Sequence, residues 1–302
     1  MAKLWAPLFS HTARGPLGDL LEFMRTPAGP SVRKKAIPTG PVTLAQQYQR
    51  WDYQFWLTFW QALTPAQKAA QEKLGTDHHM PGLAWFMKTQ LTSLPGLLAR
   101  YHLDEPSGTV ARDSSSLKLN ATITATSSLP AAIDNGRLLS AAAAQIVSPY
   151  SNLLIPSANN FTLSLFNKPS AWAGETNLLR VERSQGGSWG IYFHLLATGK
   201  YQIALGTGAT GWAQKVSATS ASTNMRHLAV TFNSAQVTFY FDAIPEGPYN
   251  LPATIAWGTP RIRLGPISPP YTDTSLLDEF SWWDIVLTQA QIKLLAERKW
   301  PL

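Results

Sequence analysis

The chain reads Tyr101-His102-Leu103-Asp104-Glu105 at one point and Leu277-Asp278-Glu279-Phe280-Ser281 near its C-terminal end. Between these two stretches lie short runs of alternating apolar and polar residues, separated by glycine, proline, asparagine and serine. Clear examples are Phe161–Phe166, Trp189–His194 and Arg226–Phe232. A period of two predicts strands, and strands this short and this evenly spaced favour a β-sandwich.

The order of the motifs in this region resembles the laminin-G-like, concanavalin A-like jelly-roll domain. The motifs are Asp104-Glu105, Asp113-Ser114-Ser115, the stretch 155–164, the stretches 227–232 and 237–242, and Leu277-Asp278-Glu279 with a trailing helix from Thr288. The resemblance implies a mainly β fold, a two-sheet jelly-roll sandwich over residues 99–302. Such domains bind ligands and rarely catalyse, so it implies a protein that is not an enzyme and has no catalytic residues. Ala243 follows Asp242 at a position where the family often has glycine, so the resemblance does not predict the conformation of this turn.

The composition sets limits on the chemistry. The 302 residues include no cysteine, which excludes disulfides, thiolate metal sites and a cysteine nucleophile. Charged residues make up only 14% of the chain, while there are 12 tryptophans. Two interpretations remain open: a surface used in a partner interface, or a compact and weakly charged β-domain. The sequence shows neither a secretory signal nor a membrane-spanning stretch, so we expect a soluble protein made in the cytoplasm.

The positive charge is concentrated at the N-terminus. Residues 1–50 hold seven Lys and Arg against two acidic residues, a balance of +5 out of the total of +7. Residues 1–42 are also rich in glycine and proline, which argues against long elements. We interpret them as an extended basic arm, although the runs Leu17–Met24 and Ser31–Ile37 could pair as strands.

Residues 43–95 carry helical signals and form a predicted anchor segment. Thr43 and Thr64 each precede a glutamine at capping-box spacing, and helices are expected over about 44–63, 65–74 with a stop at Gly75, and 82–91. The aromatic residues of the first helix lie around most of its circumference, so a neighbouring chain or the jelly roll must cover them. They include Trp51, Phe55, Trp56, Phe59 and Trp60.

The N-terminal region resembles small structural proteins of tailed phages and prophages. The stretches 13–19, 32–35, 60–70 and 82–87 carry this resemblance, which covers about residues 8–92. It implies a virion component that docks on other virion proteins through this region. The docking residues would be Arg33, Lys34 and Lys35 together with Trp51, Phe55, Trp56, Phe59 and Trp60, and we expect a homo-oligomer.

Four carboxylates form a candidate calcium site. Asp104 and Glu105 belong to the first strand of the predicted sandwich and Asp278 and Glu279 to its last, and this fold sets the two strands side by side. Ca²⁺ prefers six to eight oxygen ligands, and members of the family often bind it. The alternative is that Glu105 or Glu279 forms an ion pair with Arg112 or Arg261. Strand-end positions away from a cleft do not favour a glycosidase pair.

Exposed aromatic residues form a candidate glycan site, because flat apolar rings stack on sugar rings. The candidates lie in or beside predicted loops: Trp172, Trp189, Tyr192, Trp212 and Trp257. Packing inside the sandwich or against another subunit is the alternative for each of them.

The leading hypothesis is therefore a phage virion protein, located in the virion. Its N-terminal segment would dock on the capsid, neck or tail, and its jelly roll would serve as decoration or as an adhesin for host-surface glycans. The alternative is a free carbohydrate-binding module or an accessory domain of a glycan-processing system. The cluster Arg33-Lys34-Lys35 could contact DNA phosphates, but the proline content favours a protein partner.

Overall fold

The computed structural model describes residues 15–17, 21–26, 29–34, 43–93, 96–140, 143–170, 174–183, 188–208, 211–265 and 274–297. Its contacts divide the chain into two compact units, residues 1–48 and 49–302. The predicted division at residues 42, 95 and 99 stays a prediction.

The first unit contains a small antiparallel sheet where the sequence favoured an extended arm. Its strands are β1 (Gly15–Leu17), β2 (Leu21–Thr26) and β3 (Gly29–Lys34), in that order across the sheet. Pro16 and Pro30 lie on the two edge strands, β1 and β3. Proline, which lacks a backbone N–H, is tolerated on edge strands because only one side of such a strand is paired.

Three helices follow: α1 (Leu44–Ala62), α2 (Pro65–Asp77) and α3 (Gly82–Ser93). The capping box at Thr64 is confirmed, with Pro65 at the first helical position. The predicted stop at Gly75 is wrong, because α2 continues through it. A Cβ on Gly75 would lie 2.6 Å from the Met80 carbonyl oxygen, so glycine here permits close packing between α2 and the start of α3.

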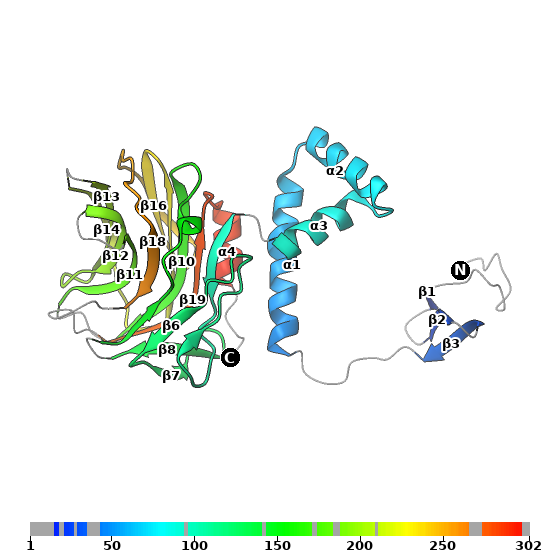
Figure 1. Cartoon of the computed structure of the whole chain (residues 1–302), viewed down its shortest axis with the longest axis horizontal. Coiled ribbons are helices and arrows are strands. Elements are labelled where there is room, and N and C mark those ends of the chain that lie inside the picture. The colour runs from blue at the N-terminus through cyan, green and yellow to red at the C-terminus, as the bar shows by residue number, and fades with distance from the viewer. Residues whose placement is uncertain are drawn as a thin grey trace. The chain divides into compact units, whose positions relative to one another are not determined.

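The second unit contains the predicted two-sheet sandwich (Figure 1). Among the described residues, the first sheet runs β17-β16-β15-β10-β19-β8-β7, with β4 also paired to β19. Its strands are β4 (Leu97–Tyr101), β7 (Ser127–Pro130), β8 (Asn135–Leu139), β10 (Asn160–Pro169), β15 (Arg226–Asn233), β16 (Gln236–Phe241), β17 (Ile244–Asn250) and β19 (Ser275–Trp283).

The second sheet runs β14-β13-β12-β11-β18-β9-β6-β5 within the described part of the chain. Its strands are β5 (Val110–Ala111), β6 (Ala121–Thr124), β9 (Gln145–Val147), β11 (Thr176–Arg183), β12 (Ser188–Leu195), β13 (Lys200–Gly208), β14 (Trp212–Ser220) and β18 (Pro260–Leu264). A short 3-10 helix covers Asn152–Leu154, and the predicted closing helix is α4 (Gln289–Ala296), capped by Thr288.

Alternate residues of the two sheets form one core between them. The rings of Phe161, Phe232 and Trp282 are fully buried, with centroids 5.3 Å apart for Phe161–Phe232 and 5.1 Å for Phe161–Trp282. The predicted proximity of the two acidic stretches is confirmed, because β4 and β19 are antiparallel neighbours with Tyr101 opposite Phe280.

A second apolar cluster lies on the outer face of the first sheet. Phe55 and Trp56 of α1 are buried there against Trp283 of β19, with Ile292 and Leu295 of α4 in the same cluster. Figure 1 shows α4 beside β19 on this side. The sequence left open whether a neighbouring chain or the jelly roll covers the aromatic residues of this helix. The jelly roll covers Phe55 and Trp56.

Candidate functional site

A β-bulge in β19 places two acidic side chains on one face of the first sheet. Pairing with β10 shifts register between Ser164 and Phe166, and Glu279 has a positive φ of 50°. Leu277 and Phe280 both belong to the core, so Asp278 and Glu279 between them both point to the outer face. Bulges commonly redirect side chains in this way beside functional sites.

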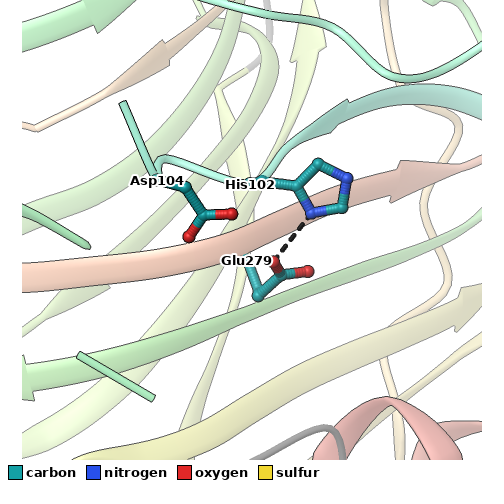
Figure 2. Close-up of side chains that lie close together, drawn as sticks. All are labelled: His102, Asp104 and Glu279. Carbon is teal, nitrogen blue, oxygen red and sulfur yellow. Dashed lines mark hydrogen bonds and ion pairs between the residues drawn. The ribbon is translucent and has the colours of Figure 1, made fainter. Parts of the chain in front are cut away.

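The prediction that Asp104 and Glu105 belong to the first strand is wrong, because β4 ends at Tyr101. Glu279 of β19 gathers a small polar cluster with residues at the end of β4 and just beyond it. His102 Nδ1 lies 2.7 Å from Glu279 Oε1, and Arg100 Nη2 lies 3.8 Å from Glu279 Oε2. One ligand atom each from His102, Asp104 and Glu279 lies within 4.8 Å of the others (Figure 2). We call these three residues the His102 cluster.

The four carboxylates predicted to bind calcium do not all meet at this cluster. Asp278 is fully buried, and its Oδ2 accepts a hydrogen bond from the Ile133 N–H at 2.9 Å. Burial, with the Glu279 carboxylate nearby, raises the pKa of Asp278 well above its ordinary value. Glu105 accepts the backbone N–H of Arg112 at 2.8 Å.

The donor set that does gather is one imidazole nitrogen and two carboxylates. This set suits Zn²⁺ better than Ca²⁺, which prefers oxygen ligands only. The Arg100 guanidinium beside Glu279 competes with any cation there. The calcium site stays a prediction.

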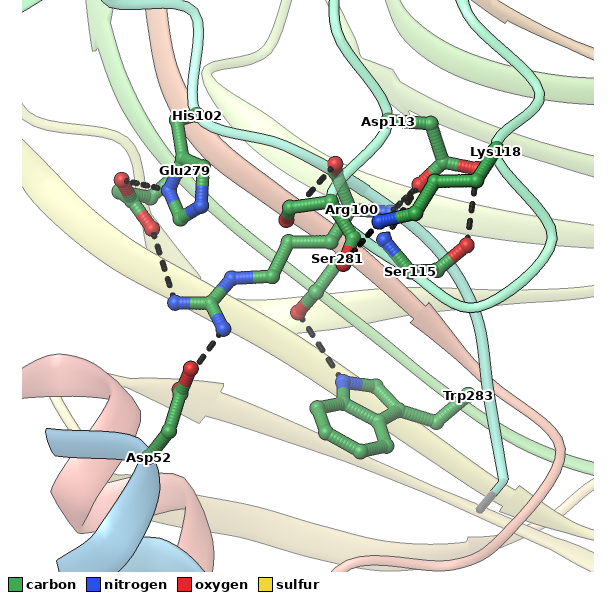
Figure 3. A network of polar contacts seen from close by, with 10 residues as sticks. Asp52, Arg100, His102, Asp113, Ser115, Lys118, Glu279, Ser281 and Trp283 are labelled. Atoms are coloured by element: carbon green, nitrogen blue, oxygen red, sulfur yellow. Dashed lines mark hydrogen bonds and ion pairs between the residues drawn. The ribbon is translucent and has the colours of Figure 1, made fainter. Parts of the chain in front are cut away.

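An open pocket of about 780 Å³ lies beside the His102 cluster. His102 and Asp104 line it together with the loop 105–110. Asp113, which also lines the pocket, accepts hydrogen bonds from the backbone N–H groups of Arg100 and Ser115 (Figure 3). It accepts a third from the backbone N–H of Leu119. The motif Asp113-Ser114-Ser115 therefore stabilises the loop, which is a structural role.

The outward face of the second sheet carries a different set of side chains. Tyr192 alternates with the core residues Ile191 and Phe193, so its ring points away from the core. Its centroid lies 4.3 Å from the Trp212 ring, and the Arg180 guanidinium lies 3.9 Å above it on the neighbouring strand. We call Arg180, Tyr192 and Trp212 the aromatic platform.

His194 lies on the same face, two residues from Tyr192. Its ring is 8% exposed, and neither ring nitrogen has a hydrogen-bond partner among the described residues. Burial and then the nearby Arg180 charge lower its pKa from 6.5 to about 4. The imidazole is therefore neutral at neutral pH.

The predicted glycan-binding residues have different environments. Tyr192 and Trp212 come together, whereas Trp257 packs against the core, with its ring centroid 6.5 Å from that of Trp282. Trp172 and the side chain of Trp189 lie outside the described residues. Sequence reasoning missed Arg180, although its alternation with Leu179 and Val181 was a signal of an outward position.

The predicted docking residues also differ. Phe55 and Trp56 are each 2% exposed and are already covered by their own chain, whereas Trp51, Phe59 and Trp60 stay half-buried. Arg33 and Lys34 end strand β3, with side chains outside the described residues, as is all of Lys35. In the described part of the chain, no helix combines the length and apolarity needed to cross a membrane.

Comparison with solved structures supports the fold, while no curated protein matches the chain in sequence. The binding domain of Paraclostridial Mosquitocidal Protein 1 matches at 14% identity with a TM-score of 0.56, over 67% of this chain and 52% of that one. Two structures of the botulinum neurotoxin DC binding domain match with a TM-score of 0.54, over 67% of this chain and 51% of theirs. The one in complex with rat synaptotagmin II is 10% identical, and the one in complex with SialylT is 9% identical.

The chain thus spans about half the length of these binding domains, and at such low identity the likeness concerns the fold alone. The sequence itself matches a family model over residues 140–293, which is half of the chain. The protein therefore belongs to the concanavalin A-like lectin/glucanases superfamily.

Proposed function

We propose that this protein is a virion component of a tailed phage and that its jelly roll binds a glycan on the host surface. The observation that carries the binding role is the aromatic platform. Neighbouring aromatic rings offer flat apolar faces to sugar rings, and the guanidinium beside them can donate hydrogen bonds to hydroxyl groups. The superfamily is named for lectins, which fits this role.

The virion role rests on the resemblance of residues 8–92 to phage structural proteins and on the basic N-terminus. Because Phe55 and Trp56 are covered by the jelly roll, docking would fall to the basic residues Arg33, Lys34 and Lys35 and to the remaining surface of the helices. The protein would be made in the host cytoplasm and incorporated into particles there.

A glycan array tests the binding role. The full chain is compared with the double variant Tyr192→Ala, Trp212→Ala and with Tyr53→Ala, whose ring is 44% exposed on α1. We expect wild type and Tyr53→Ala to bind the same glycans, and the double variant to lose at least about tenfold in affinity. Absence of any glycan binding by the wild type, or unchanged binding by a folded double variant, would refute the role.

Particle fractionation tests the virion role separately. Particles are purified from an induced culture of the source strain and probed with an antibody against this protein. Co-purification with particles, abolished in a chain that lacks residues 1–42, supports the proposal. Recovery only in the free fraction, with glycan binding intact, would instead favour a free carbohydrate-binding module.

A further inference from the structure

We propose that the second sheet also has a subsite for an acidic sugar, formed by Arg261 and Arg263 beside the aromatic platform. This inference rests on the proposed glycan-binding function and adds the chemical class of the ligand. In the register of the second sheet, Tyr192 lies opposite Arg180, and Arg180 lies opposite Arg263.

Tyr192, Arg180 and Arg263 thus form a row of paired positions across three strands, and the row continues onto the strands on both sides. Ala204 lies opposite Tyr192, and Val147 lies opposite both Arg263 and Thr122. All of these positions alternate with core residues such as Ile203, Leu264 and Ile146, so the row lies on the outward face. A single extended ligand could therefore contact aromatic rings at one end and guanidinium groups at the other.

Positive charge exceeds negative charge at the Arg end. Arg261 Nη2 and Arg263 Nη2 lie 3.0 Å and 2.9 Å from the same oxygen, Oε1 of Glu182. Arg180 Nη1 lies 3.9 Å from the other oxygen of this carboxylate, so one negative charge faces three positive charges. Ion pairing of both guanidinium groups to one oxygen also keeps N–H groups available for another acceptor, because each guanidinium has five.

The two guanidinium groups are held in place before any ligand arrives. Arg263 Nη1 donates to Gln145 Oε1 at 2.7 Å, and the Arg261 guanidinium lies 4.6 Å from the centre of the Tyr150 ring. Such fixed donors lose little side-chain entropy on binding, and a planar guanidinium matches a carboxylate or sulfate group.

A pocket opens at these groups. Its volume is about 430 Å³, within the range of about 300–1,000 Å³ that ligand pockets occupy. Arg261 and Arg263 line it with the neutral polar residues Asn120, Thr122, Thr124, Gln145 and Ser148. No acidic residue is among its described lining residues, so an anionic group entering it meets cations and neutral hydrogen-bonding groups.

The test is a titration of the full chain with oligosaccharides of equal length that are neutral, carboxylated or sulfated. The first variant is Arg261→Gln, Arg263→Gln, which removes both guanidinium charges of the subsite and leaves Glu182 beside Arg180, its third cationic neighbour, at 3.9 Å. Thr122→Phe is a second variant, which narrows the pocket at an exposed position without altering any charge. Lys168→Gln removes an exposed cation from the other sheet and serves as the control for net charge.

We expect an anionic oligosaccharide to bind at least about tenfold more tightly than the neutral one, with the carboxylated and sulfated arms identifying the group. The variant Arg261→Gln, Arg263→Gln and the variant Thr122→Phe should both lose this preference and keep neutral binding, while Lys168→Gln keeps both. Equal binding of neutral and anionic sugars, or a preference that survives in both variants, overturns the subsite and leaves the platform standing. Binding of neither sugar overturns the proposed function itself.

Discussion

Arg100 Nη1, on the first strand of the jelly roll, lies 2.8 Å from Asp52 Oδ1 on helix α1 (Figure 3). The same guanidinium approaches Glu279 on β19, so it connects the helix, the first strand and the last strand of the sandwich. Beside it, Phe55 of α1 packs on Trp283 with ring centroids 5.1 Å apart. Polar and apolar contacts thus both hold α1 against the outer face of the first sheet.

Asp52→Asn should destabilise the unit of residues 49–302. The Arg100 side chain is 4% exposed, and loss of a carboxylate partner from a buried cation costs about 1–3 kcal/mol. Urea unfolding gives the free energy. Glu297→Gln, which breaks the exposed pair Lys293–Glu297, should change it by less than about 0.5 kcal/mol. Equal effects of the two substitutions would show that the Asp52–Arg100 contact contributes no more than a surface pair.

Trp56→Ala should have a larger effect, because it leaves a cavity between α1 and the first sheet. The Trp56 side chain is 2% exposed, and truncation of a buried tryptophan typically costs about 3–5 kcal/mol. Tyr53→Ala, three residues away and 44% exposed, should cost less than about 0.5 kcal/mol. Unchanged unfolding of Trp56→Ala would mean that α1 does not pack on the sandwich in solution.

The strands with clean alternation were predictable from the sequence. Phe161–Phe166 lies within β10 and Arg226–Phe232 within β15, because every second side chain of these strands enters the core. The passage of α2 through Gly75 and the bulge at Glu279 were not predictable. Both depend on contacts between segments that the local pattern does not join.

The candidate site was predictable only in part. Tyr192 and Trp212 were identified by residue type, but the importance of Arg180 comes from its register opposite Tyr192. Arg261 and Arg263 alternate with apolar residues in the sequence, which is the pattern of a strand. Their shared contact with Glu182 depends on the pairing of β18 with β11, which the sequence does not show. Likewise, His102 joins Glu279 only because β4 pairs with β19.

Gly190→Ala should disrupt the sheet that carries the aromatic platform. Gly190 has φ of 82°, and a Cβ there would collide with the Val181 carbonyl oxygen on β11. Gly211→Ala is a matched control, since Gly211 also has positive φ but has open space around it. Thermal or urea unfolding should show Gly190→Ala at least about 2 kcal/mol less stable than the control. Similar stabilities would mean that β11 and β12 separate at little cost.

His194 should make the folded state less stable in mild acid. Its pKa is about 4 in the folded protein and 6.5 as an ordinary value, so between these values the unfolded chain binds a proton that the folded chain does not. Stability from the neutral ring is therefore complete above pH 6.5 and is lost as the pH falls toward 4. From pH 7 to pH 5 this linkage amounts to about 2 kcal/mol.

The measurement is urea unfolding of the wild type and His194→Gln at both pH values. The wild type should lose about 2 kcal/mol more than the variant, because glutamine does not titrate in this range. His79→Gln, at an exposed histidine in the turn after α2, should keep the pH dependence of the wild type. If His194→Gln also keeps it, the ring is protonated in the folded state and has more access to water than its 8% exposure indicates.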